Sequence, residues 1–134
     1  LCLAALEATL RLYRDPEKAV EAIPVLRMMS ASVESIRQRA EALAVSFHGQ
    51  LDFTVEVKGG VSYAGGGALP DEGIPTALLC VTHAILSPDD LSAALRRHAP
   101  PIVARIHDDA VVIDLRTVRD EDDETIARAL LGIG

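Results

Sequence analysis

The spacing of the apolar residues changes near Gly49, and this change constrains the fold more than any other feature of the sequence. Before it, apolar residues recur every three or four positions, which is typical of one face of a helix. The two clearest stripes are Leu3, Leu6, Leu10 and Tyr13, then Val33, Ile36, Ala40, Leu43 and Phe47. After it, apolar residues alternate with polar ones, as in a strand with one solvated face. The alternating residues are Leu51, Phe53, Val55 and Val57. The chain therefore begins with helices and continues into a sheet.

Prolines and short polar residues predict where the helices begin and end. Asp15-Pro16 stops the first helix and starts a short second one, which Ile23-Pro24 ends. Ser32 is the expected cap of a longer helix that stops at Gly49. Two further helices are expected, one starting at Ser87-Pro88 and one capped by Asp120.

Four extended segments complete the pattern. The first strand is expected to break at Gly59-Gly60, before a short extended piece and a glycine-rich loop that runs to Pro75. The continuously apolar run 76–84 predicts a central strand. Segments 102–106 and 111–116 flank a polar turn and predict an antiparallel hairpin. We expect an α+β domain with a mixed or antiparallel sheet of about four strands and helices on one face. A helical lead-in over 1–48 would precede the α+β part over 49–134.

Composition excludes several classes of protein. The net charge is −7, with 13 Lys and Arg against 20 Asp and Glu, so a stand-alone nucleic-acid binder is disfavoured. No apolar run approaches the ~20 residues of a membrane span. The four histidines have no carboxylate or cysteine at metal-binding spacing, so no metal site is expected. Cys80 lies in an apolar run and is expected to be a buried small hydrophobe. Cys2 and Cys80 are the only cysteines, and both lie among apolar residues. This favours a reducing compartment, the cytoplasm.

Two features indicate a binding site. The loop bearing Ser62 and the glycines Gly65, Gly66 and Gly67 could cradle an anion with its backbone amides, although three glycines also suit a plain flexible loop. Arg116 lies beyond the last expected strand pair, Ile102 with Leu115, and an arginine at a strand end is a good clamp for carboxylate or phosphate. A solvated surface arginine is an equally good interpretation.

Arg105 has a different expected role. If Asp108-Asp109 is a two-residue turn, Arg105 pairs with Val112 and lies diagonal to Asp114. We therefore expect Arg105 and Asp114 to form a structural salt bridge.

Several stretches together resemble one family, the bacterial seryl-tRNA selenium transferases, or selenocysteine synthases. They are Leu3–Tyr13, Ile23–Met28, Gly65–Pro70 with Pro75, Arg105–Asp109 and Asp114–Val118. The first stretch and Asp-Leu-Arg-Thr-Val are the most specific. The family commonly has Ser where this chain has Ala68. Their order resembles the C-terminal part of the family's enzymes.

The resemblance implies the C-terminal small domain of a type I pyridoxal-phosphate enzyme. Such an enzyme converts seryl-tRNA(Sec) to selenocysteinyl-tRNA(Sec): the seryl group loses water, and the aminoacrylyl intermediate accepts selenium from selenophosphate. It also implies a cytoplasmic homo-oligomer in which a large domain of the same chain carries the cofactor lysine and other domains hold tRNA(Sec). Neither Lys18 nor Lys58 lies in a stretch like that of the cofactor lysine. This fragment is therefore expected to be inactive alone, with no catalytic residue of its own and no stably bound pyridoxal phosphate.

Two alternatives stay open. The chain could be the small domain of a related pyridoxal-phosphate lyase acting on an amino-sugar phosphate or another small amine. It could also be a stand-alone binding or oligomerisation module. The chain opens at Leu1 inside an amphipathic pattern with no cap before it, which suggests a piece of a longer protein. Reading the full open reading frame would separate these alternatives.

Overall fold

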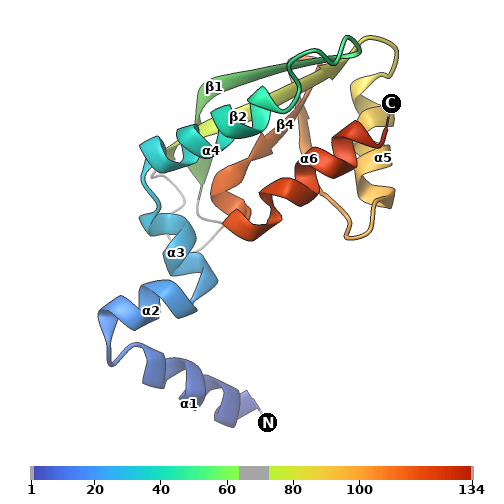
Figure 1. Cartoon of the computed structure of the whole chain (residues 1–134). Helices are drawn as coiled ribbons and strands as arrows, with labels where there is room; N and C mark the ends of the chain where they lie inside the picture. Colours follow the sequence, from blue (N-terminus) through green and yellow to red (C-terminus); the bar gives the residue numbers. More distant parts are fainter. Residues whose placement is uncertain (1, 64–72, 134) are drawn as a thin grey trace. The chain divides into compact units, whose positions relative to one another are not determined.

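A computed structural model describes residues 2–63 and 73–133 of the chain (Figure 1). The chain forms two compact units, Leu1–Ala31 and Ser32–Gly134. The sequence pattern groups residues 33–47 with the leading helices, but in the structure this helix belongs to the second unit. It does so because its apolar stripe packs on the sheet.

The first unit consists of three short helices, α1 (Cys2–Leu12), α2 (Pro16–Ala22) and α3 (Pro24–Ser30). Asp15 caps α2 by accepting a hydrogen bond from the Lys18 amide, as expected. The expected end of the second helix at Ile23-Pro24 is also the start of α3, which the sequence analysis missed. Pro24 ends one helix and suits the first position of the next, because that position needs no N–H donor.

The second unit contains a four-stranded antiparallel sheet of order β1-β2-β4-β3. The strands are β1 (Phe53–Tyr63), β2 (Gly73–His83), β3 (Arg105–His107) and β4 (Ala110–Asp114). The expected break at Gly59-Gly60 is wrong, because β1 runs through both glycines in register with β2. The side chain of Leu78 lies over Gly60, where an added Cβ would come within 2.4 Å of it.

Helices α4 (Val33–Val45) and α5 (Pro88–Arg97) pack with this sheet, and α6 (Asp123–Leu131) packs against α4. Figure 1 shows α4 and α6 lying across the same face. Alternate residues of β2 and β4 are buried there: Ala77, Leu79, Val81, Val111 and Ile113. The helices bury apolar residues too, among them Ile36, Ala40, Leu95 and Leu130, all nearly inaccessible to solvent. The α+β class is confirmed. Within the described residues, no helix combines the length and apolarity needed to cross a membrane.

The β3–β4 hairpin confirms the expected register and shortens the expected strand. Asp108 and Asp109 have φ of 49° and 54°, the left-handed pair of a two-residue hairpin turn, and Arg105 pairs with Val112. The first strand begins at Arg105 rather than at Ile102, whose amide instead bonds the Leu95 carbonyl at the end of α5. After β4 the chain enters a 3-10 turn, Leu115–Thr117.

Candidate functional site

The carboxylate of Asp114 collects hydrogen bonds from three segments of the second unit. The Ser62 hydroxyl, at the end of β1, donates to Oδ2. The Thr76 hydroxyl, near the start of β2, donates to Oδ1 over 2.8 Å, and the Arg116 amide donates to the same oxygen over 3.0 Å. We call Ser62, Thr76, Asp114 and Arg116 the Asp114 cluster.

Strand register explains why these polar side chains meet. Leu78 pairs with Asp114, Gly60 with Thr76, and Ser62 with Ile74. Since directly opposed residues project to the same face and every second residue does so along a strand, the three side chains share one face. That face is opposite to the one carrying Ala77 and Leu79, which are fully buried. Thr76 is buried, whereas Ser62 and Asp114 are half-buried, so the cluster lies at the margin between core and solvent.

Arg116 is more buried than the sequence suggests. It lies in the turn after β4 and is only 5% exposed. Its Nη2 donates to the Pro75 carbonyl over 2.6 Å, which joins the turn to the start of β2. The structure thus brings Arg116 and Ser62, both predicted site residues, to one carboxylate.

The expected salt bridge between Arg105 and Asp114 is not present among the described residues. The physical reason is that Asp114 receives its side-chain hydrogen bonds from the strands on the other side of it. Its carboxylate faces β1 and β2, which supply two hydroxyl donors, and the exposed Arg105 lies on the opposite neighbour, β3. The other predicted binding residues, Gly65, Gly66 and Gly67, lie outside the described residues.

Arg39 is a polar residue of structural importance that the sequence analysis missed. Its Nε and Nη2 bond the two carboxylate oxygens of Asp123 over 2.8 and 2.7 Å. Nη1 and Nη2 also donate to the carbonyls of Leu115 and Val118, on either side of Arg116. The hydrogen bond to Asp123 raises the pKa of Arg39, which keeps it cationic. A signal existed: Arg39 lies three residues after Ile36 and four before Leu43, within the buried stripe of α4.

The two lysines and Cys80 show no feature of a reactive centre. Lys18 and Lys58 are exposed and paired with Asp15 and Glu56 over 3.1 and 2.9 Å. The Glu56 hydrogen bond raises the pKa of Lys58, the opposite of what a nucleophilic lysine needs. Cys80 is half-buried, and burial raises the pKa of its thiol. No group of three or more potential metal ligands occurs among the described residues.

Comparison with known proteins gives one consistent family. A family model for L-seryl-tRNA selenium transferase matches residues 1–119. The L-seryl-tRNA(Sec) selenium transferase of Desulfovibrio desulfuricans is 43% identical over 97% of this chain, and that of Solidesulfovibrio magneticus is 42% identical over 97%. The corresponding protein of Geobacter sulfurreducens is 41% identical over 97%. The chain spans only 28 to 29% of the length of these three relatives. Because the family model covers most of the chain, this protein belongs to the L-seryl-tRNA selenium transferase family.

Proposed function

We propose that this chain is the C-terminal small domain of an enzyme that converts seryl-tRNA(Sec) to selenocysteinyl-tRNA(Sec), with selenophosphate as the selenium donor. The observation that carries the proposal is the family match over residues 1–119, together with relatives that bear this activity in their names. The same match favours this function over an amino-sugar lyase and over a stand-alone module.

The chemistry of the proposed reaction requires pyridoxal phosphate, which would supply an electron sink for loss of water from the seryl group. The lysines of this chain do not fit the role of the cofactor's anchor. Both are exposed and paired with carboxylates, and the pKa of Lys58 is raised rather than lowered. We therefore place the cofactor lysine in the large domain of the full-length protein, and this chain alone would be inactive.

Contact with tRNA(Sec) is proposed to come from other domains as well. The first unit carries four acidic and four basic residues, so the whole net charge of −7 belongs to residues 32–134. A sheet domain with this charge would repel a phosphate backbone. A reaction on aminoacyl-tRNA also places the enzyme in the cytoplasm, and we expect the full-length protein to be a homo-oligomer.

At the level of residues, we propose that Arg116 and Ser62 help to hold an anionic group, such as the phosphate of selenophosphate. The support is that both residues lie at Asp114, Ser62 bonding it through its hydroxyl and Arg116 through its backbone amide, and that a guanidinium can bind phosphate. Only 5% of Arg116 is exposed, so the contact would be limited to that edge of the side chain. From the sequence alone, we propose that Gly65, Gly66 and Gly67 help to bind the same anionic group.

The test uses the full-length enzyme and compares Arg116→Lys with Thr76→Val. The first change keeps the charge but loses the planar fork; the second disturbs the same cluster and leaves the guanidinium in place. If Arg116 binds the anion, its variant raises KM for selenophosphate about tenfold or more, which corresponds to the loss of a charged hydrogen bond. Equal effects of both variants on KM, or effects on thermal stability alone, would show a purely structural role.

The cofactor assignment has its own test. Borohydride reduction in the presence of pyridoxal phosphate, followed by mass measurement, should label a lysine of the full-length protein outside this chain. A specific adduct on Lys18 or Lys58 would overturn the placement of the active site.

A further inference from the structure

Helix α1 has the composition of a helix that is enclosed by other protein, yet none of its described residues is buried. Among its eleven residues only Glu7, Thr9 and Arg11 are polar. Glu7 and Arg11 pair with each other over 2.7 Å, and the Thr9 hydroxyl donates to the Ala5 carbonyl over 3.0 Å. The helix thus satisfies its own polar side chains and presents apolar atoms elsewhere.

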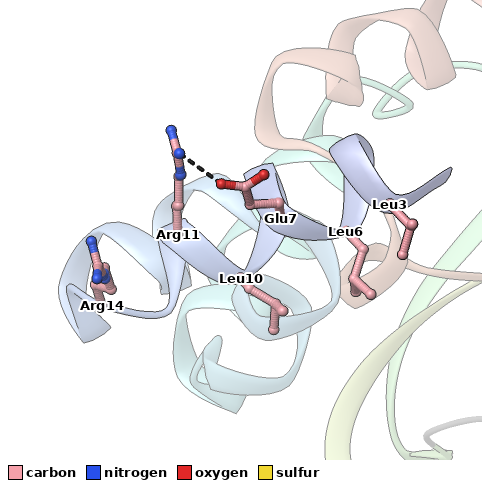
Figure 2. Close-up of a pocket in the computed structure, with 6 residues that line it drawn as sticks. All are labelled: Leu3, Leu6, Glu7, Leu10, Arg11 and Arg14. Carbon is pink, nitrogen blue, oxygen red and sulfur yellow. Dashed lines mark hydrogen bonds and ion pairs between the residues drawn. The ribbon is translucent and has the colours of Figure 1, made fainter. Parts of the chain in front are cut away.

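The leucines and the Glu7–Arg11 pair form two neighbouring strips along α1. Figure 2 shows Leu3, Leu6 and Leu10 projecting to one side and Glu7 and Arg11 to the other. The three leucines are 81, 54 and 56% exposed. They line a hollow together with Glu7, Arg11 and Arg14 (Figure 2). On a helical projection of about 100° per residue, Glu7 and Arg11 occupy a sector of only about 40°. A helix that is apolar over most of its circumference is one that is buried.

The first unit does not supply a core that could hold α1. Its buried apolar residues within the described part are Ala19 and Ile23, neither of which belongs to α1. A helix of eleven residues is marginal by itself in water, and a unit of about 30 residues is below the size at which a domain folds without help. Something outside the first unit must therefore stabilise α1.

We infer that α1 docks in an apolar groove of the large domain of the full-length protein, with the Glu7–Arg11 side facing solvent. The relatives carry more than twice as much additional polypeptide as the 28% that this chain matches, which is ample for such a groove. A second copy of α1 is a poor occupant. A helix about 16 Å long and about 10 Å wide presents one side far smaller than the roughly 800 Å² per partner of a stable interface. The identification of this large domain as the one that binds the cofactor rests on the proposed function.

Hydrogen exchange of the α1 amides tests the inference without any catalytic readout. The full-length protein and the 134-residue chain are compared by mass spectrometry of peptides that cover residues 2–12. The α1 amides should exchange at least about 100-fold more slowly in the full-length protein, because docking suppresses local unfolding. Equal exchange in the two proteins would overturn the inference. So would concentration-dependent protection in the 134-residue chain with a dimer mass in light scattering, since that outcome identifies a second copy as the occupant.

Two matched variants of the full-length protein locate the docking face. Leu6→Gln and Arg11→Gln introduce the same side chain on opposite sides of α1. Protection should fall about tenfold or more in Leu6→Gln and stay unchanged in Arg11→Gln; the reverse pattern would contradict the proposed orientation. If the full-length protein binds no pyridoxal phosphate but protects α1, the proposed function fails and the docking stands. If it is active with α1 unprotected, only the docking fails.

Discussion

Arg39 and Asp123 face each other with two parallel hydrogen bonds, Nε to Oδ2 over 2.8 Å and Nη2 to Oδ1 over 2.7 Å, across 84 residues of sequence. This pair joins α4 to the first residue of α6. Both side chains are mostly buried, with 17 and 19% exposed. The same guanidinium donates hydrogen bonds to the carbonyls of Leu115 and Val118. One side chain therefore connects α4, α6 and the turn that carries Arg116.

We predict that Arg39→Met lowers the free energy of unfolding by about 2–3 kcal/mol, because it removes the partner of a mostly buried carboxylate and leaves two carbonyls without this donor. Urea unfolding of the 134-residue chain measures the change. The matched control is Arg119→Met. Arg119 forms ion pairs with Glu121 and Asp122, and its side chain is 56% exposed. Exposed pairs contribute less than about 1 kcal/mol. Equal losses in the two variants would refute the role assigned to Arg39.

Much of the local structure follows from the sequence, because caps and turns depend on neighbouring residues. Asp15, Ser32 and Ser87 each accept an amide hydrogen bond at the start of the helix that was expected after them. Asp108-Asp109 likewise forms the expected two-residue turn. These features need only residues within a few positions of each other.

What the sequence could not provide are features that depend on contacts between distant segments. The partners of Asp114 come from strands 38 and 52 residues away, so local reasoning assigned it to the nearby Arg105 instead. Asp120 was expected to cap the last helix, but its carboxylate contacts Arg39 over 2.9 Å, and α6 starts at Asp123 after a 3-10 turn. The acidic run offers several equivalent caps, and the residue at the cap position, Asp122, makes no side-chain cap hydrogen bond.

Gly60 should be the less replaceable of the two adjacent strand glycines. An added Cβ there would lie 2.4 Å from Leu78 Cδ1 and 2.7 Å from its Cγ, whereas at Gly59 the nearest atom among the described residues is Nη2 of Arg37, at 4.0 Å. Gly60→Ala forces the largely buried Leu78 to move, at a cost of about 1–3 kcal/mol. Gly59→Ala should be neutral or slightly stabilising, because it reduces the entropy of the unfolded chain. Thermal unfolding of both variants checks this, and a Gly59→Ala loss as large as that of Gly60→Ala would be the contrary result.

His83 is expected to hold the connection between β2 and α5. Its Nδ1 accepts hydrogen bonds from the amides of both Ile85 and Leu86 over 3.1 Å, and its ring packs nearly perpendicular to that of Phe53 at a centroid distance of 4.7 Å. Replacing His83 with Phe keeps the ring but removes the acceptor, which should cost about 1–2 kcal/mol of unfolding free energy. His107→Phe is the control, because the His107 side chain is 72% exposed. Hydrogen exchange at Ile85 and Leu86 should accelerate in the first variant only; unchanged exchange there would rule out this role.

Cys80 should react slowly with thiol reagents at neutral pH, although it is one of only two cysteines. Burial raises the pKa of its thiol, which lowers the fraction of reactive thiolate at any pH below that pKa. Cys2 is exposed on α1 and has no such shielding from solvent. With iodoacetamide at pH 7, peptide mass spectrometry should find Cys2 labelled first, and raising the pH to 9 should accelerate labelling of Cys80. The Cys2→Ser variant isolates the Cys80 rate, and urea should raise that rate at constant pH by exposing the thiol. Labelling of Cys80 at pH 7 as fast in the folded variant as in urea would show that burial does not protect it.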